Sequence, residues 1–79
     1  MTWIVYVLKC SDGTFYTGIT NNLKNRIIAH QNGEGAKYTK GRGPFVIFYT
    51  EKCKSRSIAS KREVEIKKLK REQKLKLKS

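Results

Sequence analysis

The feature that most constrains this chain is a run of β-branched, aromatic and aliphatic residues near its start, at residues 3–8. Such residues favour strands, and because polar residues do not alternate with them, both faces of the strand are apolar. A turn-forming segment at 11–14 and a second strand-like segment at 15–19 follow directly. The pattern predicts a β-hairpin. Something must pack over this hairpin on at least one side, and helices must supply that cover.

The segment after the hairpin has the pattern of a helix. Short polar residues at 20–22 can cap its start, apolar residues recur at helical spacing, and Asn32-Gly33 is a typical end signal. We therefore expect a helix over about residues 23–31. Arg26 and His30 are four positions apart, so they are neighbours on one face of this helix.

A third strand and a second helix complete the expected fold. Residues 44–50 are mostly apolar and aromatic, with Pro44 at the first position of the strand, where a missing N–H is tolerated. From Ser55 or Ser57 to about Arg71, apolar residues fall within about a 100° arc of a helical wheel, which indicates a packed helix. The order is β-β-α-β-α, an α+β fold with a three-stranded, mainly antiparallel sheet and helices packed on it. We expect one domain over residues 1–79, with a basic C-terminal tail from about residue 72.

The charge of the chain indicates its class of partner. Its 79 residues include 18 Lys and Arg against 6 Asp and Glu, a formal net charge of +12. Such an excess favours a polyanion, nucleic acid above all. The apolar runs are far below the roughly 20 residues that span a bilayer, so we expect no membrane partner. Cys10 and Cys53 lack zinc or C-x-x-C spacing and indicate reduced thiols, and without a secretory signal in the chain as given we expect a cytoplasmic protein.

Four sequence elements, in order and spacing, resemble the GIY-YIG nuclease superfamily over nearly the whole chain. Ile4-Val5-Tyr6 stands where the first family tripeptide sits, and Tyr16-Thr17-Gly18 where the second sits. Arg26 matches the family's helix arginine, and Glu63 matches its late-helix glutamate. The segment at 35–44 is similar to the loop of the small standalone bacterial members and of the eukaryotic flap- and junction-cutting subunit.

The chain departs from the family pattern at three positions. The leading glycine of the first tripeptide is Ile4 here, which the small members commonly tolerate. The excision-repair nuclease carries a lysine just after its second tripeptide, where this chain has Ile19. His30 stands where that relative has a further tyrosine, so the set of groups that handle protons is expected to be rearranged.

The resemblance implies metal-dependent hydrolysis of phosphodiester bonds. Glu63 would hold one Mg²⁺ or Mn²⁺ ion through a carboxylate oxygen, with water and phosphate completing the shell. Tyr16 would be the general base, and because a free tyrosine has a pKa of about 10, it would need positive charge from Arg26 and the metal. Arg26 would also grip the scissile phosphate. Tyr6 and His30 are second candidates for orienting the water or carrying its proton.

Each of these side chains also has a structural interpretation. Tyrosine is common as a half-buried strand residue, which describes Tyr6 and Tyr16. Arg26 alone would be a solvated helix arginine, and His30 alone a partly buried helix histidine. Glu63 follows Lys61-Arg62, which could hold it in a surface ion pair worth little. The family resemblance favours the functional interpretation most strongly for Tyr16 and Arg26.

A glycine-rich segment at 33–43 is predicted to be a basic loop. Its candidate nucleic-acid-binding residues are Lys37, Tyr38, Lys40 and Arg42. Glycines and cations suit tracking of a phosphate backbone, and an aromatic ring suits stacking on a base or sugar. A merely solvated connection is the alternative. The lysine-rich end at 74–78 has the same two interpretations, diffuse phosphate binding or a disordered tail.

These observations support three hypotheses. The first is a DNA endonuclease selective for flaps, branches or single-strand junctions, with a role in DNA repair or recombination, since no segment resembles a helix-turn-helix or zinc reader of base edges. The second is a non-catalytic module that binds DNA or RNA on the same scaffold, which Ile19 and the single carboxylate keep open. The third is a subunit that needs a protein partner, because so small a domain has little area to grip a substrate alone.

The net charge predicts steeply salt-dependent binding. On duplex DNA, log affinity should fall against log salt with a slope of about −0.9 per neutralised phosphate. Replacing Lys37, Lys40 and Arg42 together with glutamine should flatten that slope, because the loop would then neutralise fewer phosphates. Titrations of labelled duplex at several salt concentrations measure the effect. An unchanged slope would mean that the loop does not touch the backbone.

Overall fold

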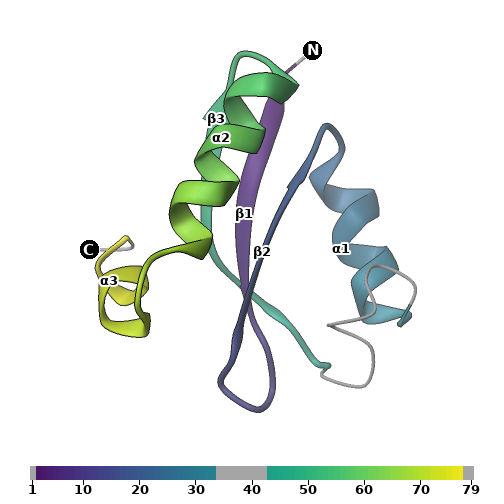
Figure 1. Ribbon diagram of the computed structural model, residues 1–79. Coiled ribbons are helices and arrows are strands. Elements are labelled where there is room, and N and C mark those ends of the chain that lie inside the picture. The colour runs from purple at the N-terminus through teal and green to yellow at the C-terminus, as the bar shows by residue number, and fades with distance from the viewer. Residues whose placement is uncertain (1, 34–42, 78–79) are drawn as a thin grey trace.

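The computed structural model describes residues 2–33 and 43–77 of the chain. Its elements run in the order β1 (Trp3–Lys9), β2 (Phe15–Thr20), α1 (Leu23–Gln31), β3 (Val46–Cys53), α2 (Arg56–Lys67) and α3 (Arg71–Lys76). The strands form one sheet in the order β2-β1-β3, and both pairings are antiparallel (Figure 1). The predicted α+β class is therefore confirmed.

The central strand β1 is buried on both faces. Val5 and Val7 point to one face and pack with Ile66 of α2. Tyr6 and Leu8 point to the other face and pack with apolar side chains of α1. In Figure 1, α2 lies in front of β1 and β3, and α1 lies to the right of β2. Helices on both sides explain why the first apolar run shows no alternation.

Helix α1 has the predicted bounds because its end signals are local. The side chain of Asn22 accepts a hydrogen bond from the backbone N–H of Asn25 at 3.2 Å and so caps the first turn. Gly33 follows the helix with a φ of 77°, a conformation that glycine adopts at little cost. Between these ends, His30 is buried and Arg26 is half-buried. The helix thus directs both predicted site residues toward the sheet.

The third strand differs from the prediction of residues 44–50. It begins at Val46, two residues after Pro44, and continues to Cys53. Its last three residues pair with the start of β1. The local sequence does not indicate this extension of the strand. Because β3 is an edge strand, Lys52 can be exposed there, whereas the Glu51 carboxylate accepts a hydrogen bond from Arg62 of the second helix at 3.0 Å.

The second helix begins as predicted but ends early. Ser55 caps it by accepting a hydrogen bond from the Ile58 N–H at 3.2 Å. The helix stops at Lys67 rather than at about Arg71, and α3, which the sequence analysis did not predict, covers part of the expected tail. Leu77 lies off the apolar arc of α2, so a straight helix could not bury it. The break redirects the chain and lets Leu77 pack against the core.

Two further expectations concern the thiols and membranes. Cys10 and Cys53 are both free, in agreement with the prediction of reduced thiols, and both are buried. Within the described part of the chain, the helices are too short or too polar to cross a bilayer.

Candidate active site

The site is organised around the ring of Tyr6, which lies over Gly18. The antiparallel register makes these two residues partners across β1 and β2. A Cβ added to Gly18 would lie 2.6 Å from the Tyr6 Oη and 2.7 Å from its Cζ. Real Cβ atoms essentially never come within 3.0 Å of another heavy atom, so the glycine of the second tripeptide makes room for the tyrosine of the first.

The Tyr6 hydroxyl is enclosed by two side chains of α1. Its Oη lies 2.9 Å from His30 Nε2 and accepts a hydrogen bond from Arg26 Nε at 3.3 Å. Tyr6 is 0% exposed and His30 is 1% exposed. Burial raises the pKa of Tyr6 above its usual value, although the hydrogen bond from Arg26 opposes this effect. Tyr6 therefore keeps its proton at neutral pH.

His30 is the second buried polar group. Burial lowers the pKa of this imidazole, and the charge of Arg26 lowers it further, so His30 is neutral at pH 7. A neutral ring with its proton on Nδ1 can accept the Tyr6 proton at Nε2. The ring also packs edge-on against Tyr16, with centroids 5.1 Å apart, and against Phe45, with centroids 6.0 Å apart.

Arg26 links the two tyrosines. Its hydrogen bond with Tyr6 is the main cause that raises the pKa of the guanidinium, burial opposes the rise, and a hydrogen bond with Tyr16 adds to it. The rings of Tyr6 and Tyr16 lie 6.2 Å apart, centroid to centroid. A permanently charged, fork-shaped donor thus sits beside both hydroxyls, a position suited to a phosphate.

Glu63 of α2 belongs to the same neighbourhood. Its negative charge contributes to the raised pKa of Tyr6. The side chain of Glu63 is 22% exposed, and its Oε2 lies 3.4 Å from Lys67 Nζ. Glu65, by contrast, is 62% exposed and pairs with Arg62 at 3.6 Å. The helical wheel leaves both glutamates at the border of the apolar arc, whereas Glu63 is the more buried of the two and the one whose charge acts on the Tyr6 pKa.

The donor set suits a particular kind of metal ion. Within residues 2–33 and 43–77, no three His, Cys, Asp or Glu side chains gather to hold a metal. A cage made wholly of protein ligands therefore does not fit these residues. A single carboxylate oxygen from Glu63, with water and phosphate as the remaining ligands, does fit Mg²⁺ or Mn²⁺, which accept such shells. A metal bound at the Oε2 atom of Glu63 would compete with Lys67 for that oxygen.

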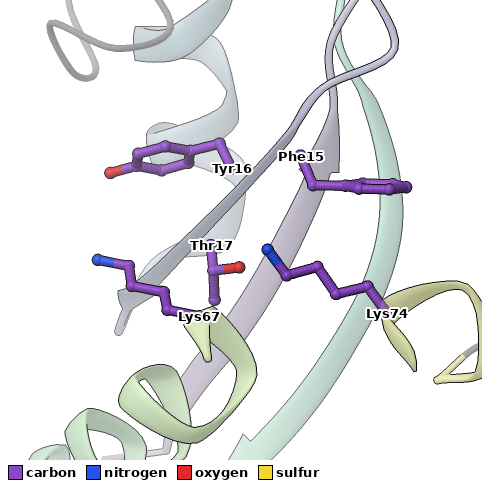
Figure 2. A pocket seen from close by; sticks show the side chains of 5 residues that line it. All are labelled: Phe15, Tyr16, Thr17, Lys67 and Lys74. Atoms are coloured by element: carbon purple, nitrogen blue, oxygen red, sulfur yellow. The ribbon is translucent and has the colours of Figure 1, made fainter. Parts of the chain in front are cut away.

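Tyr16 opens onto a hollow at the edge of the sheet. The residues that line the hollow are Phe15, Tyr16, Thr17, Lys67 and Lys74. Figure 2 shows the Tyr16 hydroxyl and the Lys67 amine extending in the same direction. Sequence reasoning missed Lys67, Lys74 and Thr17 as site residues. The position of Lys67, four residues after Glu63, is the one signal that could have indicated a contact.

The structure thus brings together Tyr6, Tyr16, Arg26 and His30, and Glu63 is linked to them by the effect of its charge on the Tyr6 pKa. The predicted nucleic-acid-binding residues Lys37, Tyr38, Lys40 and Arg42 lie outside the described residues. Their role stays a prediction.

Comparisons with known proteins agree with the motif analysis. The sequence model of the family described as GIY-YIG catalytic domain matches residues 2–76. A UPF0213 protein of Clostridium perfringens is 58% identical over 73 residues, 92% of this chain and 78% of that protein. A UPF0213 protein of Oceanobacillus iheyensis is 52% identical over 73 residues, 92% of this chain and 85% of that protein. The solution NMR structure of an E. faecalis protein aligns with a TM-score of 0.67 and 42% identity, covering 96% of this chain and 81% of that chain.

The contact between Tyr6 and Gly18 predicts a large effect of one methyl group. Gly18→Ala should lower the free energy of unfolding by about 1–3 kcal/mol, because the buried ring of Tyr6 must shift. Urea unfolding measures this loss. Gly43→Ala is the matched control, since its Cβ would meet Phe45 at an ordinary 3.6 Å. Equal stability of Gly18→Ala and the wild type would contradict the packing argument.

Proposed function

The chain belongs to the GIY-YIG family, and from this membership we propose that it is an endonuclease that hydrolyses phosphodiester bonds in DNA with the help of one divalent cation. The observation that carries the proposal is the position of Arg26 between two tyrosine hydroxyls, with the charge of Glu63 acting on Tyr6. Tyr6, Tyr16, Arg26 and Glu63 come from β1, β2, α1 and α2. Convergence of polar groups from four elements at one place is unusual for a solvated surface and supports a catalytic interpretation.

Tyr16 is the proposed general base, and burial distinguishes it from Tyr6. The Tyr6 hydroxyl is enclosed by His30 and Arg26 and has a raised pKa, so it is poorly placed to take a proton from water. Tyr16 is only partly buried and borders the open hollow. Arg26 supplies the neighbouring cation that a tyrosine base requires.

Arg26 is the proposed clamp on the scissile phosphate. Its Nε is engaged by Tyr6, so we assign the phosphate to the terminal nitrogens of the guanidinium. Tyr6 and His30 then act as positioning residues, because their mutual hydrogen bond fixes the oxygen that holds the Arg26 fork. Either would carry a proton only as a second choice after Tyr16.

Glu63 is the proposed ligand of the divalent ion, Mg²⁺ or Mn²⁺, through one carboxylate oxygen. When bound, such an ion would neutralise charge on the phosphoryl oxygens and help to activate the attacking water. The contribution of the chain is to present a half-buried carboxylate whose charge acts on Tyr6, and to pair it with Lys67 at 3.4 Å when no ion is bound.

The proposed substrate is DNA recognised by its backbone and shape. The net charge of +12 favours phosphate contacts, which position a protein but carry no base sequence. The described residues hold no three-donor metal cluster of the kind that supports a zinc reader. We therefore extend the proposal to flaps, branches or single-strand junctions, which occur in repair and recombination. A protein partner that adds binding area is compatible with the small size of the chain.

A specific observation favours a second candidate function. The carboxylate of Glu63 already has a cationic partner in Lys67, as it would in a module that binds DNA or RNA without cleaving it. Incubation with labelled duplex, single-stranded, flap and branched DNA, with Mg²⁺ or Mn²⁺ and with EDTA as control, separates the two. Metal-dependent nicking of any of them supports the endonuclease. Binding of all of them without nicking supports the module.

Replacing Tyr16 with phenylalanine tests the proposed base. The ring and its packing are kept, so stability should change little while the cleavage rate falls by about 10²-fold or more. Tyr6→Phe is the matched variant and should instead lower stability by about 1 kcal/mol, because it leaves His30 and Arg26 without their shared partner. Single-turnover cleavage and thermal melts of both variants give the comparison. A crippled Tyr6→Phe beside a nearly normal Tyr16→Phe would reverse the assignment.

The choice between the two glutamates gives a further test. Glu63→Gln should abolish metal-dependent cleavage while folding and DNA binding persist, because the change removes the ligand charge and little volume. Binding should stay the same or tighten as repulsion from phosphate is relieved. Glu65→Gln, on the exposed side of α2, should keep wild-type activity. Wild-type cleavage by Glu63→Gln at saturating Mg²⁺, or an inactive Glu65→Gln, would refute the metal assignment.

A further inference from the structure

The hollow beside Tyr16 is large enough to hold a ligand, and the proposed chemistry assigns no ligand to it. Its volume is about 310 Å³, and it is largely open to solvent. Ligand pockets in proteins begin at about 300 Å³, so this one suits a small group rather than a large cofactor. Three of its lining residues belong to β2, and Lys67 and Lys74 reach it from α2 and α3 (Figure 2).

Thr17 gives the hollow an unexplained polar group. The residue is 3% exposed, and its Oγ1 has no hydrogen-bond partner among the described residues. A buried hydroxyl without a partner destabilises a fold, and valine would fill the same space without that cost. Thr17 is therefore poorly explained by packing alone. A ligand oxygen in the hollow would satisfy it.

The charged groups of the lining select an anion. Lys67 and Lys74 are both cations, and none of the described residues that line the hollow carries a carboxylate. Lys67 shares its charge with Glu63 at 3.4 Å, which leaves Lys74 as the cation to test. Figure 2 shows the Lys74 side chain directed from α3 toward β2, on the side of the strand where the Thr17 oxygen points. Lysine stems are flexible, so the amines can move aside when an anion reaches Thr17.

The ring of Phe15, one of the two aromatic residues of the lining, is already packed against other side chains. The ring of Phe15 packs against Phe48 with centroids 5.0 Å apart. The guanidinium of Arg71 lies 5.1 Å from the Phe15 centroid. Because Phe48 and Arg71 already contact this ring, Phe15 contributes an apolar surface to the hollow. Arg71 adds a positive charge close to that surface. A phosphate fits this lining better than a nucleobase.

We propose that this hollow binds a non-scissile phosphate of the DNA strand whose neighbouring linkage is cleaved beside Tyr16. The inference rests on the proposed endonuclease function. Consecutive strand residues point to opposite faces, so Tyr16 and Thr17 face the two sides of β2. Since β2 is an edge strand, a DNA strand that crosses this edge meets Arg26 and Tyr16 on one side and Thr17 with Lys74 on the other.

The first experiment measures binding of a labelled single-stranded oligonucleotide in EDTA by fluorescence anisotropy. Lys74→Gln should reduce the salt slope by about 0.7, the value for one phosphate of a single strand. Lys68→Gln is the control, because it removes the same charge from an exposed position that does not line the hollow. Equal slopes for the two variants, or no measurable binding by the wild type, would overturn the subsite.

Variants of Thr17 separate a ligand contact from a structural role. Thr17→Val should bind the oligonucleotide about 2- to 10-fold more weakly, the worth of one hydrogen bond, while its melting temperature stays the same or rises. Thr17→Ser keeps the hydroxyl and should retain most of the affinity. Unchanged affinity in Thr17→Val, or a loss in Thr17→Ser as large as in Thr17→Val, would overturn the contact.

A neutral linkage then tests the phosphate itself. Replacing single phosphates of the oligonucleotide by methylphosphonate should weaken wild-type binding at one linkage, and Lys74→Gln should show no further loss at that linkage. Equal losses in the wild type and Lys74→Gln at every linkage would refute the inference. The binding measurements are made in EDTA, so they do not depend on cleavage. If the coupling is found there but no DNA is nicked in the assay with Mg²⁺ or Mn²⁺, the endonuclease proposal alone is overturned. Nicking without this coupling would overturn the subsite alone.

Discussion

The contact of the Tyr6 ring with Gly18 is the constraint on which the site depends. It joins the two tripeptide motifs across the β1–β2 pairing, because the tyrosine of one needs the missing side chain of the other. The ring can then carry its hydroxyl to where Arg26 and His30 approach from α1. A side chain at position 18 would move that oxygen, and with it the guanidinium proposed to hold the phosphate. The two motifs are therefore one structural unit in this chain.

The strand β1 is buried on both faces, and the helices that cover it supply the other side chains of the site. With α1 on one face and α2 on the other, the cation and the imidazole come from one helix and the carboxylate from the other. The cation and the imidazole meet at the Tyr6 hydroxyl, and the carboxylate acts on the same tyrosine through its charge. A domain of this size buries only about 60% of its unfolded surface, so its stability margin is small. The face of β1 toward α2 carries the apolar cluster of Val5, Val7 and Ile66, whereas the face toward α1 also holds the hydroxyl of Tyr6 with His30 and Arg26.

The sequence predicted what depends on local signals. The hairpin, the bounds of α1 and the start of α2 follow from turn residues, caps and periodicity. The end of β3, by contrast, depends on pairing with β1, and the break after Lys67 depends on the packing of Leu77. In the site, the motif residues were found because their spacing is fixed along the chain. Thr17 and Lys74 were missed because they are far apart in the sequence, and tertiary packing alone places β2 and α3 around the same hollow.

Lys67 connects the two halves of the proposed mechanism. It pairs with Glu63 in the structure and also lines the hollow with Thr17 and Lys74. A divalent ion at Glu63 would compete with this ion pair and free the amine for a phosphate in the hollow. Coupling between two ligands is reciprocal, so a phosphate that draws Lys67 away would strengthen the affinity of Glu63 for the ion by the same factor. In the proposed mechanism, Lys67 would therefore neutralise the carboxylate until a divalent ion and a phosphate of the substrate replace it.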